Sequence, residues 1–316
     1  MTKRRTLDPD DARRLRAIMR PIIAARFAAL WTAEPAARAF DDPEGVHDMR
    51  VASRRLRAAL DISRDLYPAP WFARLRDTVK TLTRALGDVR DADVMLAVLA
   101  EKHASVPGVD RLMTRVTQDR DAARVRLLAL LDELHGRGVR EKALQRFGDE
   151  TKIPQVRKRD AQRLVATRAT AFLALAGDLP AAGEAPALHD LRIAAKRLRY
   201  TLQMVDAAFG EPGKVTLDRL TTLQDQLGEI HNLDVLLDLA GTGLHALTDE
   251  ALASAAAGSP APDAATAAGL LALVADASRE RQQHYDAAAA AWATHHEHLN
   301  EDIRALAGIK KGHGHA

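Results

Sequence analysis

The chain has 316 residues, of which 47% are hydrophobic and 28% are charged, a composition typical of a protein with a substantial packed core. It contains no cysteine, which excludes disulfides, thiolate metal ligands and cysteine nucleophiles. The formal net charge is only +3, so the placement of the cations matters more than their small excess.

No apolar run approaches the roughly 20 residues that a membrane-spanning helix needs. The first residues, MTKRRTLDPDD, lack the apolar segment of a secretory signal. We therefore expect a cytoplasmic protein without a membrane partner.

Apolar residues recur at helical spacing along most of the chain, and no segment alternates convincingly as a strand would. Strong helix formers such as alanine, leucine and arginine are abundant. We therefore predict an all-α protein of about ten helices. In the first half the expected helices are 10–31 (with Pro21 as a candidate kink), 43–66, 71–86, 88–103, 109–134 and 139–147, with Gly87 between the third and fourth.

The helical pattern restarts at Gln155, just after Pro154, which predicts a boundary between two halves. Alanine-rich residues 251–269 predict a helix end and a loop before a long last helix. The expected organisation is a first helical bundle at 1–150, a second at 151–300 and a disordered tail at 301–316.

The second half repeats the first. VHDMRVASRRLRAAL aligns with LHDLRIAAKRLRYTL, so that His47 falls on His189. TLTRALGDVRDADVMLAVL aligns with TLQDQLGEIHNLDVLLDLA, and upstream of both blocks Arg26 falls on Arg168. Three blocks that match in the same order exclude chance. They predict two similar helical bundles related by a pseudo-twofold axis.

Each copy of the first block places a histidine and three cations on one face of a helix, about 15 Å long, with leucines on the opposite face. These residues are His47, Arg50, Arg54 and Arg57 in the first copy, and His189, Arg192, Lys196 and Arg199 in the second. Like charges at such spacings repel one another. Because both halves have kept them, the pattern indicates an extended anion site rather than an ordinary solvated surface.

The pattern His-Asp-x-Arg-x-x-x-(Arg/Lys)-(Arg/Lys)-Leu-Arg, followed by Leu-Gly-x-(Leu/Val/Ile)-Arg-Asp-x-Asp-Val, resembles the CHAD family, named for a histidine-containing α-helical domain. The resemblance extends over roughly residues 8–300. It implies two four-helix bundles around a basic central cavity that binds inorganic polyphosphate. It also implies a binding protein of polyphosphate granules rather than an enzyme, without a cofactor and with granule-associated proteins as candidate partners.

Carried onto this sequence, the resemblance assigns phosphate binding to the eight residues of the two basic faces. The candidate set also contains four cations outside these faces: Lys80, Arg90, Arg26 and Arg168. The second half has Thr221 and His231 where the first has Lys80 and Arg90, so we expect the two walls of the cavity to be unequally charged.

Two solution properties follow from the residue types. Arginine and lysine side chains are the usual ligands of phosphate oxygens. By analogy with single-stranded nucleic acid, six permanent cations predict a salt slope of at most about −4. The two histidines predict tighter binding at pH 6 than at pH 8, because an unperturbed imidazole gains its proton near pH 6.5.

Three other functions stay open from the sequence. A metal-dependent phosphohydrolase could use the pairs His47–Asp48 and His189–Asp190, although the surrounding cations would repel a divalent ion. A histidine could be the site of phosphorylation, but the chain contains no kinase-type nucleotide-binding motif. Binding of nucleic acid or another polyanion is the strongest alternative. Single-strand binders, however, stack bases on aromatic rings, and Tyr200 falls well to one side of the basic face.

Histidines near the C-terminus form a weaker pattern. His295, His296 and His298 have a spacing that metal ligands can have, but a solvated helix face is the simpler interpretation. His313 and His315 in the expected tail could bind metal adventitiously.

Overall fold

The structure is a computed structural model that describes residues 8–148, 155–259 and 263–310. Within these ranges every regular element is a helix, so the all-α prediction is confirmed. The first part of the chain forms α1 (Pro9–Thr32), α2 (Glu34–Ala39), α3 (Pro43–Ile62), α4 (Pro70–Lys102), α5 (Val109–Gly136) and α6 (Val139–Phe147). The second part forms α7 (Lys158–Leu173), α8 (Ala185–Leu202), a 3-10 turn (Asp206–Ala208), α9 (Glu211–Ala256) and α10 (Ala264–Ala307).

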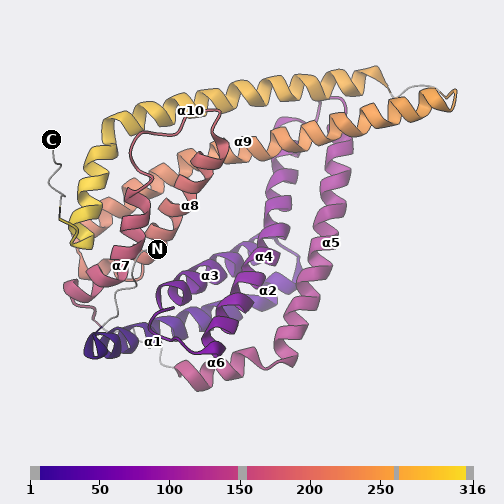
Figure 1. Ribbon diagram of the computed structural model, residues 1–316. Coiled ribbons are helices and arrows are strands. Elements are labelled where there is room, and N and C mark those ends of the chain that lie inside the picture. Colours follow the sequence, from indigo (N-terminus) through magenta and orange to yellow (C-terminus); the bar gives the residue numbers. More distant parts are fainter. Residues whose placement is uncertain (1–7, 149–154, 260–262, 311–316) are drawn as a thin grey trace.

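The helices form two groups that follow the order of the chain (Figure 1). In the first group α3 packs against α1, α2 and α4, and α6 packs against α1 and α5. In the second group the long helices α9 and α10 pack against each other, while α8 packs against α7 and α9. The groups contact each other where α3 meets α8, where α5 meets α9, and where an ion pair joins Asp11 of α1 to Arg163 of α7.

Apolar packing joins the two groups. One core cluster contains Met19 and Leu56 from the first group together with Phe172 and Leu198 from the second, all of them fully buried. The predicted bundles at 1–150 and 151–300 therefore share a core. The expected boundary residue, Pro154, lies outside the described residues.

A second, smaller apolar cluster lies where α4 and α5 reach α9 and α10. Leu99 and Leu112 contribute from the first group, and Leu236 and Leu273 from the second. Together with the contact between α3 and α8, this cluster fixes the two groups to each other at separate points. The helices between these points thus have a defined relative position.

The predicted helix break at Gly87 is wrong, because α4 runs without interruption from Pro70 to Lys102. Gly87 is buried beside the side chain of Arg50, and a Cβ atom on it would lie 3.6 Å from the Arg50 Nε atom. That distance is an ordinary van der Waals contact, so Gly87 neither interrupts α4 nor is required by the approach of Arg50.

The prediction also differs from the structure at two other places. The six-residue α2 is absent from the prediction, because so short a helix shows no apolar period. The predicted disordered tail is wrong for residues 301–307, which continue α10 and bury Ile303 and Leu306. His313 and His315 lie outside the described residues. Among the helices that the structure describes, none has the length and apolar character to cross a membrane.

Candidate functional site

The two basic helices, α3 and α8, pack against each other. Their leucine faces hold them in place, since Leu56 and Leu60 of α3 and Leu191 and Leu198 of α8 are all 0% exposed. Fixing the apolar face of each helix in the core also fixes the opposite face, which carries the cations.

Five cations from the two helices gather where α3 and α8 meet, and we call them the central cluster: Arg50, Arg54, Arg192, Lys196 and Arg199. Burial lowers the pKa of the Arg54 guanidinium, and the neighbouring arginines of both helices lower it further, while Tyr200 opposes the shift. Burial and then Arg50 lower the pKa of Arg192 in the same way. The repeat thus brings cations from both halves into one site.

Lys196 is the most strongly perturbed member of the central cluster. Burial, followed by the repulsion of Arg54, Arg192 and Arg50, lowers the pKa of its amine from 10.5 to about 6. Asp91 opposes this shift, but its Oδ1 atom accepts a hydrogen bond from the Arg50 Nη2 atom at 3.1 Å. In the free protein Lys196 is therefore mostly neutral above pH 7.

Tyr200 connects the basic faces of the two helices. The guanidinium carbon of Arg54 lies 5.1 Å from the centre of its ring, and that of Arg199 also lies 5.1 Å away. One aromatic ring thus holds a cation from each half of the chain by cation–π contact. The prediction that Tyr200 lies to one side of the basic face was wrong for the folded protein. A helical wheel of α8 alone cannot show that Arg54 of α3 packs against the Tyr200 ring.

Several guanidinium nitrogens of the central cluster have no partner in the described structure. The Nε atoms of Arg50, Arg192 and Arg199 are buried without a hydrogen-bond acceptor. A buried donor left without an acceptor costs about 1–3 kcal/mol. An anion that supplies oxygen acceptors would remove this cost at several arginines at once.

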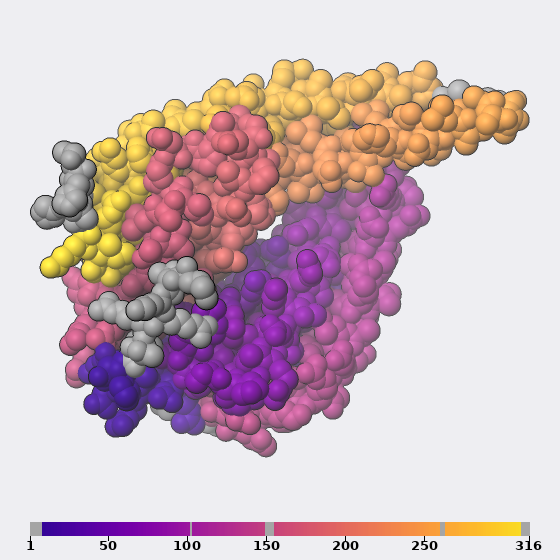
Figure 2. Space-filling view, viewed as in Figure 1, coloured from indigo at the N-terminus to yellow at the C-terminus, as the bar shows by residue number. Residues whose placement is uncertain are grey.

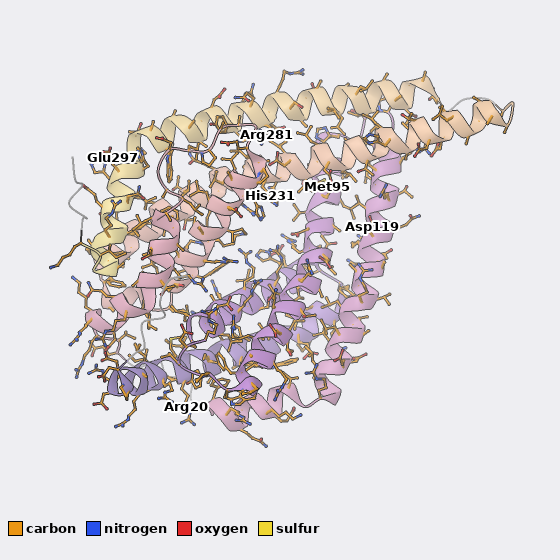
Figure 3. All side chains as sticks on the ribbon, in the orientation of Figure 1. Arg20, Met95, Asp119, His231, Arg281 and Glu297 are labelled. Atoms are coloured by element: carbon orange, nitrogen blue, oxygen red, sulfur yellow. The ribbon has the colours of Figure 1, made fainter. Side chains whose placement is uncertain are left out.

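Two histidines extend the site toward α9. The ring centres of His189 and His231 lie 5.4 Å apart. Burial, then Arg192 and His189, lower the pKa of His231. His231 projects from α9 toward α3 and α4 (Figure 3). His47, at the matching place on α3, is half-buried.

The surface is hollowed between α9 and the helices α3 and α4 (Figure 2). The members of the central cluster belong to α3 and α8, which border this hollow together with α4 and α9. We call it the central groove.

Three of the other predicted cations are not among the main charges that shift the pKa of Arg54 or Lys196. The Arg57 Nε atom lies 3.8 Å from the Asp61 Oδ2 atom, and the Arg90 Nη2 atom lies 3.3 Å from the Glu44 Oε1 atom. Each of these two arginines therefore has an acidic partner. Lys80 is exposed on α4. The two walls of the groove are unequal here, since His231 of α9 stands where α4 carries Arg90.

Arg26 and Arg168 lie among other charges. Burial lowers the pKa of both, and Arg55 is the next cause at Arg26. At Arg168, Arg197 adds to the lowering and Asp61 opposes it. Arg55 and Arg197 are the cations that fall outside the two basic faces. Arg168 and Arg197 line a pocket of about 460 Å³ between α7 and α8, and His189 reaches the same pocket.

Among the histidines of α10, His295 and His298 are exposed, and His296 has a structural contact. The Nδ1 atom of His296 donates to the carbonyl oxygen of Trp292 at 2.8 Å, and the two rings stack. Within the described residues, no three histidine or carboxylate side chains are grouped as metal ligands would be.

Comparisons with known proteins agree with this architecture. A family model described as the CHAD domain matches residues 21–241, which include both basic helices. The crystal structure of the CHAD domain from the plant Ricinus communis is similar, with a TM-score of 0.59 and 24% identity over 93% of this chain and 91% of that one. PptA from Streptomyces chartreusis is similar with a TM-score of 0.61 and 16% identity, over 88% of this chain and 98% of that one. No curated protein matches the chain.

Proposed function

The chain belongs to the CHAD-domain family, and on this premise we propose that its central cluster binds inorganic polyphosphate without cleaving it. One observation carries the proposal, namely that five cations from both halves meet in one site and bury guanidinium donors that lack acceptors. Such a site fits a ligand with many closely spaced anionic oxygens.

Inorganic polyphosphate meets this requirement because each phosphate unit carries a charge and free oxygens along an unbranched chain. Arginine forks hold such oxygens with two parallel hydrogen bonds. Arg54 of α3 and Arg199 of α8 contact the same ring, so cations from both helices lie close enough to bind neighbouring phosphates of one chain. Asp91 is the resident acid that the ligand would displace from Arg50.

Binding without cleavage follows from the residue types in the cluster. Hydrolysis of a phosphoanhydride needs a base or a metal-bound water to supply the nucleophile. The Asp91 carboxylate is engaged by the Arg50 guanidinium, and the neutral Lys196 amine should take up a proton once an anion binds beside it, which removes its lone pair as a base. The cluster is therefore suited to holding the chain and not to activating water against it.

We also propose that the protein resides in the cytoplasm on polyphosphate granules, where other granule-associated proteins are its candidate partners. A granule presents the proposed ligand at high local concentration. A fluorescently tagged protein should coincide with a polyphosphate stain, and a diffuse signal in cells that contain stained granules would contradict this location.

The binding proposal is tested with polyphosphate of defined length and the double variant Arg50→Ala/Arg192→Ala. Loss of two charge-assisted contacts should weaken binding at least about 100-fold. The control Arg13→Ala/Arg279→Ala removes the same charge from residues whose side chains are 81% and 69% exposed, and should bind nearly as the wild type does. An equal loss in both variants would show that net charge alone drives binding.

Two further measurements separate the proposal from its rivals. Incubation with polyphosphate and Mg²⁺ should leave the chain length unchanged, and progressive shortening would make the protein an enzyme. In competition, polyphosphate should displace an oligonucleotide of equal charge from the central groove. Preference for the oligonucleotide would assign the groove to nucleic acid.

A further inference from the structure

A second group of cations lies in a pocket between the start of α4 and α6. The pocket has a volume of about 470 Å³, within the range of small-ligand sites. Its walls include Trp71 and Arg74 of α4, Arg137 before α6, and Lys142 and Arg146 of α6. In Figure 1, α6 lies at the edge of the molecule opposite α9 and α10. The pocket is thus built from other residues than the central cluster.

Helical spacing explains why these side chains converge. Trp71 and Arg74 are three residues apart in the first turns of α4, and Lys142 and Arg146 are four apart in α6, so each pair shares one helix face. The buried ring of Phe147 links the helices, since its centre lies 5.9 Å from that of Trp71. The pocket is therefore supported by a packed aromatic contact.

The walls of the pocket are cationic. Among the described residues that line it there are four cations and no carboxylate. Glu133 lies 3.0 Å from Arg137, and Lys142 donates to the Arg137 carbonyl oxygen at 2.6 Å, which orients the amine at the pocket wall. This arrangement favours an anionic ligand of small size.

An aromatic platform distinguishes this pocket from an ordinary basic patch. The guanidinium carbon of Arg146 lies 4.4 Å from the centre of the Trp71 ring. Nucleobases stack on aromatic rings and on guanidinium planes, and every base has such a flat face. Trp71 is half-buried, so part of its surface is accessible from the pocket.

We propose that this pocket binds a nucleoside phosphate, with the base stacked on the Arg146 guanidinium that Trp71 supports and the phosphates held by Arg74 and Lys142. The ligand chemistry has two possible sources, a free nucleotide or the terminal nucleotide of a single strand. The proposal does not depend on polyphosphate binding, because it concerns another site and another ligand.

The test compares adenosine diphosphate with inorganic pyrophosphate on the full chain, by calorimetry. The two ligands carry similar phosphate charge, and only the first has a base. Stacking should make adenosine diphosphate bind about tenfold more tightly. Trp71→Leu should remove this preference and Trp71→Phe should keep most of it, which also checks that the fold tolerates a change at this position.

Two controls locate the effect. Because pyrophosphate can also bind the central groove, both titrations are repeated in the Arg50→Ala/Arg192→Ala background, where the preference for the nucleotide should persist and where adding Arg74→Gln/Lys142→Gln should weaken both ligands together. Equal affinity of the two ligands, no detectable binding, or loss of the preference only in the groove variant would each overturn the proposal. A short oligonucleotide that binds more tightly than the diphosphate supports the strand end as the source, and one that binds no better supports the free nucleotide.

Discussion

At the scale of one residue, Lys196 shows that the cations of the central cluster lower the stability of the protein without its ligand. Its pKa falls from 10.5 to about 6 on folding, because it is buried among arginines. Between these two values the unfolded chain binds more protons than the folded one, so this residue makes the protein more stable as the pH rises through the interval. The same repulsion makes the site receptive to an anion.

Binding of polyphosphate above pH 7 should be accompanied by proton uptake at Lys196. An anion beside the amine raises its pKa again, so the affinity should increase as the pH falls from 8 to 6. His231, whose pKa is also lowered, should add to the uptake at the acidic end. Calorimetry in buffers of different ionisation enthalpy measures the number of protons, which should approach one at pH 7.5.

Two variants of Lys196 provide the matched comparison for proton uptake. Lys196→Arg keeps a permanent charge and should bind polyphosphate with little proton uptake. Lys196→Met should bind more weakly and, because it removes the buried amine, should unfold at a temperature at least about 2 °C higher at pH 7. Unchanged proton uptake in the arginine variant would assign the proton to another group.

Tyr200 should contribute to polyphosphate binding through its aromatic ring, which positions Arg54 and Arg199, and not through its hydroxyl group. The ring holds Arg54 and Arg199 at equal distances, and a desolvated cation–π contact is worth up to about 2 kcal/mol. Tyr200→Leu should therefore weaken polyphosphate binding about tenfold, while Tyr200→Phe should change it little. Similar losses in the two variants, measured by the same titration, would point to the hydroxyl instead.

The sequence predicted the members of the central cluster better than it predicted their surroundings. The internal repeat singles out residues such as Arg54 and Lys196, because equivalent positions in the two halves carry the same kind of charge. It cannot show that Tyr200 lies against Arg54, or that Asp91 lies against Arg50, since these contacts join different helices. Such contacts depend on tertiary packing.

At the scale of whole elements, the apolar period located most helices well, and the exceptions have physical causes. The helix at 139–147 begins and ends where it was predicted to, because Val139 and Phe147 are both apolar and glycines flank them. Gly87 was taken as a helix break, but it lies inside α4, and a Cβ atom there would make only ordinary contacts. A single glycine in a helical pattern can end a helix or lie within it, and the sequence alone does not distinguish the two.

Glycines in the two longest helices should respond oppositely to substitution by alanine. A Cβ atom on Gly269 of α10 would overlap the carbonyl oxygen of Pro107, so Gly269→Ala should lower the free energy of unfolding by about 1–3 kcal/mol. Gly228 of α9 has open space around its Cβ position, so Gly228→Ala should raise it by about 0.5–1 kcal/mol. Denaturant unfolding of both variants measures the difference, and a destabilised Gly228→Ala would contradict the packing described for α9.

At the scale of the whole molecule, the two groups of helices meet where α5 contacts α9 and, at a separate place, where α3 contacts α8. In Figure 1, α9 and α10 extend beyond the contact with α5. The central groove lies between these contacts, so its width is set by long helices anchored at both ends. This arrangement favours a site that is largely formed before the ligand arrives.

The chain carries a formal net charge of only +3. The proposed function therefore requires that the cations of the central groove, and not the net charge, attract polyphosphate. Asp91 and Asp77 both lie on α4 and are both exposed, but only Asp91 bonds to Arg50 of the central cluster. Asp91→Asn should therefore tighten polyphosphate binding about threefold, because it removes one negative charge beside the proposed site and frees Arg50 for the ligand. It should also steepen the salt slope by about 0.7.

Asp77→Asn changes the net charge by the same amount at a distance from the groove, and its affinity and salt slope should stay close to those of the wild type. Titrations at several salt concentrations measure both quantities for the two variants. If Asp77→Asn and Asp91→Asn gained affinity equally, the protein would attract polyphosphate through its overall charge, and the geometry of the central cluster would have no special part in binding. A gain confined to Asp91→Asn requires that the anion lie beside Arg50, because screening at physiological salt limits the reach of one exposed charge to about 8 Å.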